Sequence, residues 1–400
     1  MLVTSFDFDE LRRWPDLEAP NLFAVDASDR LILDEARAAV AAAGRRQVVV
    51  IGDHYGALTI GIAADPGARG IRVFQDVLIN EAALAANAKA AAEDDLIVDY
   101  ENLPLGAELL AGATVVLLQL PRSLAELDEI AATIARNADP DVQVFAGGRI
   151  KHISITMNDV LTKYFATLDV SLARQKSRVL IARSPLASPA TELAPVSAGS
   201  APIEPAREFN AEIGLWVVSH GAVFAGTKLD LGTRLLLSVL EQAAPDAADA
   251  IDLGSGTGIL AAALAKARPQ LTVIATDQSA AAVASSLATV EANGLSDRVS
   301  VTRDDGLASQ PDASADLIVL NPPFHVGSTV HTGLAAKLFH DAARVLRPGG
   351  ELWTVYNSHL LYRPTLASVV GPTKEIVRDK RFTVTRSKRA LYPAGPPPAQ

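Results

Sequence analysis

The chain has 400 residues, of which 49% are hydrophobic and 5% aromatic, and its formal net charge is −10. This charge excludes a protein that coats nucleic acid non-specifically, and the absence of cysteine excludes disulfides, thiolate metal sites and cysteine nucleophiles. No apolar run approaches the roughly 20 residues of a membrane-spanning helix, and the N-terminus lacks the basic and apolar regions of a signal peptide. We therefore expect a cytoplasmic protein with no membrane association and with two domains.

The first half of the chain alternates between predicted strands and helices. Residues 47–63 predict a strand, a glycine-containing loop and a helix. Residues 70–76 predict a second strand, 80–93 a helix and 113–123 another strand. A segment with five prolines, residues 185–206, follows and predicts a linker. Strands that alternate with helices predict a parallel sheet with helices on both faces.

The second half repeats this order of elements. Residues 250–265 again predict a strand, a glycine loop and a helix. Residues 271–277 predict a strand, 279–295 a helix and 315–324 a strand. The last ten residues, 391–400, are rich in proline and predict a disordered tail.

The spacing between two landmarks, the first glycine of the loop and a polar residue after a later strand, indicates that the two halves are diverged copies. From Gly52 to Gln119 is 67 positions, and from Gly254 to Asn321 is also 67 positions. We therefore expect an α/β protein with two doubly wound domains of similar design.

The glycine loop of the second half predicts a cofactor site. Asp252, Gly254, Gly256 and Gly258 form a D-x-G-x-G-x-G pattern between a strand and a helix. Glycine lets the backbone turn sharply and lets a ligand approach the main chain. Asp277 ends the next strand, where a carboxylate can accept hydrogen bonds from ribose hydroxyls. A nicotinamide or flavin would fit the loop taken alone, but the spacing and the acid before the first glycine favour S-adenosylmethionine.

A further acid follows a third strand. Asp305, next to Asp304, is placed to accept a hydrogen bond from the adenine amino group. The alternative is a loop acid that caps a helix or forms an Asx turn.

The first copy lacks most of these features. Its loop, from Gly52 to Gly56, carries His54 and Tyr55 where a cofactor needs open backbone, and has no middle glycine. Asp76 remains at the position expected to meet a ribose. We predict that this half binds cofactor poorly.

Asn321, Pro322, Pro323 and Phe324 predict a target site for an amine. They follow a strand end, where ligands bind in open α/β sheets. The side-chain oxygen of Asn321 and the carbonyl oxygen of Pro322 can accept hydrogen bonds from the two N–H groups of an aryl amine. They would then direct the nitrogen lone pair at a methyl carbon. Phe324 offers a flat face to an extruded base. This chemistry depends on positioning and requires no metal.

Two clusters of positive charge interrupt the acidic chain. Residues 361–400 hold eight Lys/Arg and two Asp/Glu, and Arg174, Lys176, Arg178 and Arg183 lie near the end of the first half. Either they bind phosphates locally or they are solvated strand edges and helix ends.

The motifs resemble those of the ribosomal RNA guanine-N2 methyltransferases, a family that comprises a small-subunit methyltransferase C branch and a large-subunit methyltransferase G branch. The shared stretches are AVFAGTKLDLGTRLLL, DLGSGTG, AVASSLATVEANG, NPPFH and GELWTVYNSHL. The resemblance covers nearly the whole chain and is closer to the large-subunit branch. It implies two tandem Rossmann-like class I methyltransferase domains, the first degenerate, and a guanine of 23S rRNA as target.

The resemblance also implies the roles of parts and residues. Residues 1–184 would bind substrate without catalysis, and residues 207–390 would be catalytic. The implied cofactor residues are Gly254, Gly256, Asp277 and Asp305, and the implied base-binding residues are Asn321, Pro322 and Phe324. The family more often has Asn at the position of Asp305.

Three other interpretations stay open. The acceptor could be 16S rRNA, or a protein glutamine or small amine. Both copies could also be inactive, which would leave a non-catalytic RNA-binding assembly factor. We expect a monomer that binds large-subunit rRNA.

Overall fold

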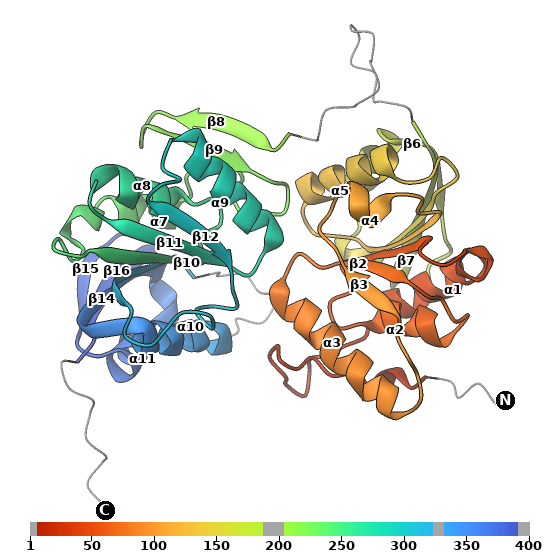
Figure 1. Cartoon of the computed structure of the whole chain (residues 1–400), viewed down its shortest axis with the longest axis horizontal. Helices are drawn as coiled ribbons and strands as arrows, with labels where there is room; N and C mark the ends of the chain where they lie inside the picture. The colour runs from red at the N-terminus through yellow and green to blue at the C-terminus, as the bar shows by residue number, and fades with distance from the viewer. Residues whose placement is uncertain (1–5, 187–203, 323–331, 391–400) are drawn as a thin grey trace, which may run out of the picture. The chain divides into compact units, whose positions relative to one another are not determined.

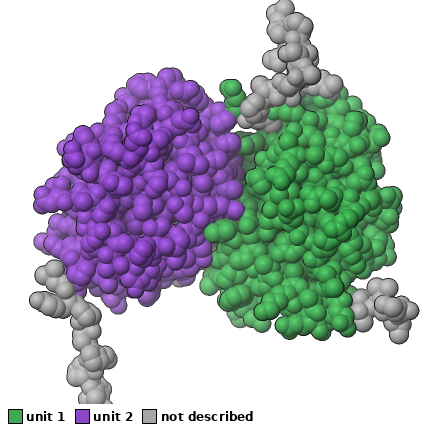
Figure 2. Space-filling model, in the orientation of Figure 1, with its two compact units in different colours: residues 1–204 green, residues 205–400 purple. Residues whose placement is uncertain are grey.

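A computed structural model describes residues 6–186, 204–322 and 332–390. The chain divides into two compact units, Met1–Glu204 (unit 1) and Pro205–Gln400 (unit 2), which Figure 2 colours green and purple. Within the described ranges, no helix has the length and apolar character needed to span a membrane. Strands reach into both ends of the predicted linker, because Pro185 ends one strand and Ala206 begins the next.

Unit 1 is a seven-stranded sheet between helices (Figure 1). Its strand order is β3-β2-β1-β4-β5-β7-β6. The strands are β1 Val48–Ile51, β2 Ile71–Phe74, β3 Tyr100–Asn102, β4 Val115–Gln119, β5 Gln143–Arg149, β6 Phe165–Val170 and β7 Ser177–Pro185. The helices are α1 Ala27–Ala42, α2 Ala57–Ala64, α3 Leu78–Glu93, α4 Ala107–Leu110, α5 Leu124–Asn137 and α6 Ile155–Thr162.

Unit 2 has the same topology, with the order β12-β11-β10-β13-β14-β16-β15. The strands are β10 Asp249–Leu253, β11 Thr272–Asp277, β12 Val299–Arg303, β13 Ala315–Leu320, β14 Leu346–Asn357, β15 Thr373–Arg378 and β16 Phe382–Lys388. The helices are α7 Leu231–Leu237, α8 Ile259–Ala267, α9 Ala280–Ala292, α10 Thr332–Val345 and α11 Arg363–Val369. The predicted fold of two Rossmann-like domains is confirmed. Each sheet has one antiparallel member, β7 or β16, which the strand and helix pattern did not predict.

The central strands are buried on both faces, which explains their continuous apolar sequences. In β1, Val48 and Val50 join one hydrophobic core, whereas Val49 and Ile51 join the core on the other face. Strand β10 divides in the same way, because its alternate residues join two different cores. Burial on two faces leaves the carboxyl edge of each sheet for polar residues.

From the glycine loops to the ends of β4 and β13, the two copies are offset by 202 residues. The amide of Gly52 donates to the carbonyl of Phe74 at 3.0 Å, and that of Gly254 donates to Thr276 at 2.8 Å. By this offset Asp277 corresponds to Gln75. The prediction that Asp76 is the unit 1 counterpart of Asp277 is therefore wrong by one residue. Strand β2 ends at Phe74, two residues before Asp76, the predicted end of this strand.

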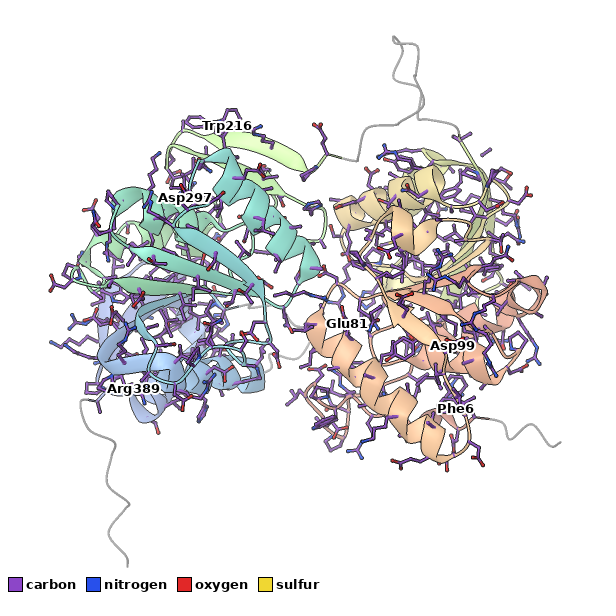
Figure 3. All side chains as sticks on the ribbon, viewed as in Figure 1. Phe6, Glu81, Asp99, Trp216, Asp297 and Arg389 are labelled. Carbon is purple, nitrogen blue, oxygen red and sulfur yellow. The ribbon has the colours of Figure 1, made fainter. Side chains whose placement is uncertain are left out.

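Unit 2 also has a two-stranded sheet of β8 (Ala206–Asn210) and β9 (Leu215–Ser219). The backbone of Trp216, which Figure 3 labels, exchanges two hydrogen bonds of 3.0 and 2.7 Å with the side chain of Asn293, just after α9. This sheet therefore packs on α9 and leads the chain toward α7.

Candidate functional site

The loop between β10 and α8 has three glycines with left-handed backbone. The φ angles of Gly254, Gly256 and Gly258 are 73°, 56° and 74°. A Cβ atom on Gly254 would meet nothing within 4 Å, and one on Gly256 would meet only Val223 at 3.9 Å. These two residues therefore border open space, which suits a ligand that lies against the backbone. A Cβ on Gly258 would lie 3.0 Å from the backbone of Ser286, so this glycine permits packing on α9 instead.

Asp277 holds the loop in shape from the end of β11. One carboxylate oxygen accepts from the amide of Gly256 at 3.0 Å, and the other accepts from Ser279 at 3.0 Å. This places the predicted ribose acceptor directly against the middle glycine of the loop.

Asp252 is buried beneath the loop, and its predicted contact with a cofactor stays a prediction. Its side chain is buried in β10, and one carboxyl oxygen accepts from the amide of Ala261 in α8 at 2.9 Å. Burial raises the pKa of Asp252 to about 7, and the negative charge of Asp277 adds to the increase. Asp252 therefore stabilises the strand–helix junction beneath the loop.

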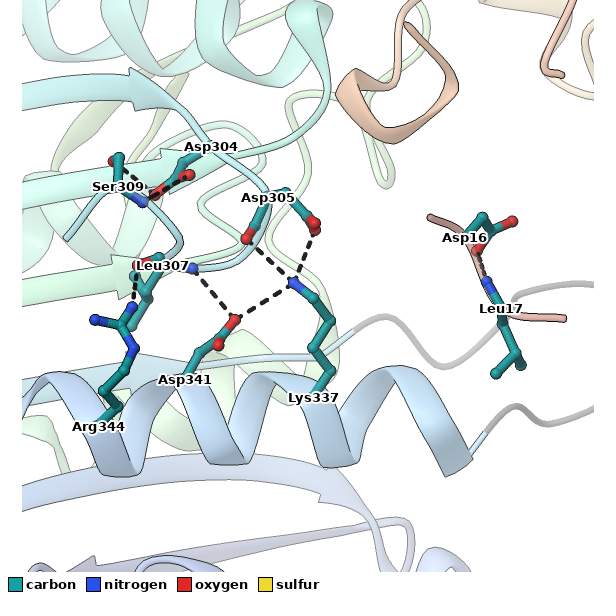
Figure 4. A network of polar contacts seen from close by, with 9 residues as sticks. All are labelled: Asp16, Leu17, Asp304, Asp305, Leu307, Ser309, Lys337, Asp341 and Arg344. Atoms are coloured by element: carbon teal, nitrogen blue, oxygen red, sulfur yellow. Dashed lines mark hydrogen bonds and ion pairs between the residues drawn. The ribbon is translucent and has the colours of Figure 1, made fainter. Parts of the chain in front are cut away.

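The two acids after β12 have different surroundings (Figure 4). Asp304 is buried and accepts from the amide and hydroxyl of Ser309 at 3.0 and 2.8 Å. Asp305 is partly exposed and forms an ion pair of 2.9 Å with Lys337 of α10, which also lies 3.4 Å from Asp341. Burial alone would lower the pKa of Lys337, but the two carboxylates raise it. The predicted adenine acceptor thus already binds a cation.

Asn321 follows β13 at the carboxyl edge of the sheet, one strand away from the glycine loop. Its side-chain nitrogen donates to the hydroxyl of Thr233 at 2.9 Å and lies 3.4 Å from a carboxylate oxygen of Asp230. Its side-chain oxygen is buried and has no hydrogen-bond partner among the described residues. A buried carbonyl oxygen without a donor is unfavourable, so this atom is suited to receive one from a bound molecule.

The start of α7 determines which way this amide points. Asp230 caps the helix by accepting from the amides of Gly232 and Thr233 at 2.9 and 3.1 Å. A carboxylate only accepts hydrogen bonds, so the NH2 group of Asn321 must face it and the oxygen must face away. A Cβ on Gly232 would lie 3.5 Å from that oxygen, so the glycine leaves room beside it. The D-x-G-T pattern from Asp230 to Thr233 is typical of a helix N-cap. The contact of its side chains with Asn321 is not evident from the sequence.

The equivalent loop of unit 1 is filled by side chains. His54 takes the place of Gly256 and keeps a left-handed φ of 57°. Its amide donates to the side-chain oxygen of Gln75 at 3.1 Å, as Gly256 donates to Asp277. The imidazole Nδ1 lies 3.1 Å from the side-chain nitrogen Nδ2 of Asn80. The imidazole therefore stands where the backbone is open in unit 2.

Gln119 occupies the position of Asn321 in unit 1. Its amide nitrogen donates to Asp29 near the start of α1, and its oxygen lies 3.4 Å from the hydroxyl of Ser28. Burial raises the pKa of Asp29 to about 8. The contact between strand end and helix start is thus present in both units, and in unit 1 a serine hydroxyl lies beside the side-chain oxygen of Gln119.

Pro322 is buried beside Asn321. Pro323, Phe324 and His325 lie outside the described residues, so the predicted stacking of a base on Phe324 stays a prediction.

Two protein families match parts of the chain: the RLMG N-terminal domain over residues 2–186 and the Methyltransferase small domain over residues 214–386. The Ribosomal RNA large subunit methyltransferase G of Streptomyces coelicolor is 32% identical over 382 residues, which cover 94% of this chain and 97% of that protein. The protein of the same name from Stutzerimonas stutzeri is 32% identical over 391 residues, with coverages of 98% and 100%. Among solved structures, the T. thermophilus 16S rRNA N2 methyltransferase RsmC, in complex with AdoMet and guanosine, aligns with a TM-score of 0.68 and 20% identity over 93% of this chain and 97% of that chain. This last likeness establishes the fold.

Proposed function

This chain belongs to the ribosomal RNA large subunit methyltransferase G family, and on that premise we propose that it transfers a methyl group from S-adenosylmethionine to the exocyclic N2 amine of a guanine in 23S rRNA. The observation that carries the proposal is the buried side-chain oxygen of Asn321 after β13, which has no hydrogen-bond partner among the described residues. Residues 207–390 are the catalytic part in this proposal, and residues 1–184 bind substrate without catalysis. The enzyme acts in the cytoplasm as a monomer.

The open backbone of the glycine loop supports the methyl donor. Gly254 and Gly256 border space in which a ligand can contact the main chain. In this proposal Asp277, which accepts a hydrogen bond from the Gly256 amide, also accepts hydrogen bonds from the ribose hydroxyls. Asp305, which pairs with Lys337, accepts a hydrogen bond from the adenine amino group. When bound, the donor supplies a methyl carbon on a positively charged sulfur.

The residues after β13 hold the amine. The side-chain oxygen of Asn321 and the carbonyl oxygen of Pro322 accept hydrogen bonds from the two N–H groups of the amine. Because both bonds are then fixed, the nitrogen lone pair is withdrawn from conjugation with the ring and directed away from these oxygens. As the N–C bond forms, the S–C bond breaks and a neutral thioether leaves. The two oxygens stabilise the positive charge that develops on the nitrogen, which then loses one of its two protons to water. The reaction therefore depends on how rigidly the two acceptors are held.

Replacement of Asn321 by Ala tests this assignment. We expect Asn321→Ala to abolish transfer of tritiated methyl groups to 23S rRNA and to leave cofactor affinity, measured by calorimetry, within a few fold of wild type. An unchanged rate would refute the assignment of Asn321. No cofactor binding by the wild-type chain would refute the enzyme itself and favour an assembly factor.

The acceptor is tested in the same assay. Naked 23S rRNA, 16S rRNA, assembled large subunits and cellular protein fractions are offered separately to the wild-type enzyme. We expect incorporation into large-subunit RNA and its loss in Asn321→Ala. Incorporation into 16S rRNA or protein alone would replace the proposed substrate.

A further inference from the structure

Phe382, the first residue of β16, lies at the same edge of the unit 2 sheet as Asn321. It pairs in register with Asn357, the last residue of β14, and β14 runs parallel to β13 and continues beyond its end. The carboxylate of Asp379 accepts from the amide of Phe382 at 2.6 Å, and the amide of Asp379 donates to the Phe382 carbonyl at 3.0 Å. The backbone that carries the ring is therefore fixed at the edge where Asn321 lies.

The ring of Phe382 and the side-chain oxygen of Asn321 approach the same glycine of α7. A Cβ atom on Gly232 would lie 3.3 Å from Cε1 of Phe382 and 3.5 Å from Oδ1 of Asn321. The oxygen is buried and has no hydrogen-bond partner among the described residues, whereas the ring is only partly buried. A group that donates a hydrogen bond to this oxygen therefore comes close to both the glycine and the ring.

Unit 1 has a different residue at the position of the ring. Arg149 at the end of β5 pairs with Ser177, the first residue of β7. In the same way, Asn357 at the end of β14 pairs with Phe382, the first residue of β16. Ser177 is therefore the counterpart of Phe382, and it is completely buried. The sheet that the two units share does not require an aromatic ring at this position.

Unit 1 also has a side chain where unit 2 has a glycine. Asp26 and Asp230 each cap a helix by accepting from an amide two residues later. This amide belongs to Ser28 in unit 1 and to Gly232 in unit 2. The hydroxyl of Ser28 lies 3.4 Å from the side-chain oxygen of Gln119. In unit 1 a serine thus lies beside the amide oxygen, and in unit 2 a glycine leaves that position to another molecule.

We propose that the ring of Phe382 contacts the target guanine and that Gly232 leaves the space in which the exocyclic amine reaches Asn321. The inference rests on the proposed function and adds two residues to its target site. The amide oxygen selects a group that donates hydrogen bonds, and the ring restricts where a flat, extruded base can lie. Unit 1, with Ser28 and Ser177 at these two positions, lacks both features.

Phe382→Leu tests the ring in the full chain. Leucine is apolar but has no ring, so the single-turnover rate of methyl transfer to saturating 23S rRNA should fall by about fivefold or more. The affinities for cofactor and for rRNA, measured by calorimetry and filter binding, should stay unchanged, because neither depends on this one base contact. Phe382→Tyr keeps the ring and should restore most of the rate. Phe209→Leu, at an exposed ring of the same unit, is the matched control and should retain the wild-type rate.

Gly232→Ser tests the space beside Asn321. The variant gives unit 2 the residue that unit 1 has at this position, and its side chain would lie between the ring and the amide oxygen. We expect the same rate to fall by about tenfold or more, because the side chain takes the place of the amine and its hydroxyl can donate to the oxygen. The reverse exchange in unit 1, Ser28→Gly, is the control and should leave the rate unchanged.

A wild-type rate in either Phe382→Leu or Gly232→Ser would overturn the proposal. A loss of cofactor affinity as large as the loss of rate would indicate a purely structural role and would overturn it as well. Thermal unfolding establishes that each variant is folded; if Phe382→Leu is not, Phe382→Met, whose flexible side chain adapts to the space, takes its place with the same expected loss. Wild-type chain that methylates no RNA would refute the proposed function itself, whereas active enzyme with fully active variants would refute only the contact with Phe382.

Discussion

Thr233 accepts a hydrogen bond from the side-chain amide of Asn321 at 2.9 Å, although 88 residues separate them in the chain. Together with Asp230, which caps α7 and lies 3.4 Å from the same nitrogen, it leaves the oxygen of Asn321 as the acceptor that faces the site. Gln119 and Asp29 make the corresponding contact in unit 1. The N-terminal end of a helix, α7 in unit 2 and α1 in unit 1, therefore helps to orient this side-chain amide in both copies.

Thr233→Val should lower kcat by about fivefold or more. Valine has nearly the same shape but cannot accept the hydrogen bond, and one such bond contributes about 1 kcal/mol. The amide then rotates more freely, so fewer bound guanines are correctly oriented. Single-turnover methylation, with calorimetry for cofactor affinity, checks this. Thr233→Ser keeps the hydroxyl and should restore most of the rate; a similar loss in both variants would contradict the orienting role.

Gly256→Ala should weaken cofactor binding by roughly tenfold or more. The left-handed φ of 56° disfavours alanine by about 1 kcal/mol, and the added methyl group enters the space where the ligand is expected. Isothermal calorimetry should also give one cofactor site per chain. His54→Gly, the same position in unit 1, serves as the comparison and should leave both stoichiometry and affinity unchanged. Two sites per chain in wild type would show that unit 1 retains a working site.

Asp305→Asn and Asp305→Leu should differ in cofactor affinity. Both substitutions remove the ion pair with Lys337. This ion pair is partly exposed and therefore contributes less than about 1 kcal/mol to stability. Asparagine retains an oxygen acceptor for the adenine amino group, so its Kd should stay within about threefold, whereas leucine should lose about tenfold or more. Lys337→Met, which breaks the ion pair but keeps Asp305, is the control. Equal Kd values for all three variants would exclude an adenine contact.

Asp252→Asn should change the pH dependence of stability. The pKa of Asp252 is about 7 in the folded chain and about 4 when unfolded, so the folded state binds more protons between these values. The free energy of unfolding therefore falls as pH rises from about 4 to about 7. The variant removes a contribution of up to about 1.4 kcal/mol per pH unit to that slope. Denaturant unfolding at several pH values measures it, with exposed Asp297→Asn as control. An unaltered slope would mean that the carboxyl group is ionised throughout.

The sequence determined the fold and the location of the site because both depend on local patterns. Apolar strands, helix periodicity and glycine loops repeat with the same 67-residue spacing, and polar residues follow strands that end at one edge. Motif and spacing alone therefore predicted that Asn321 and Gly256 lie after neighbouring strands, at the carboxyl edge of one sheet, where the structure has them. The sequence pattern could not show whether Gln75 or Asp76 is the unit 1 counterpart of Asp277. Both residues are polar and adjacent, and only the register of the strands distinguishes them.

The tertiary structure decided which side chains act together. The hydrogen bond between Thr233 and Asn321 spans 88 residues of the chain. The ion pair between Lys337 and Asp305 joins α10 to the loop after β12. Similarly, the sequence shows Arg174 and Arg178 as equal members of one basic cluster. Only folding brings Asp34 to the first and leaves the second without an ion-pair partner among the described residues, because the distance between charges is set by packing and not by position in the chain.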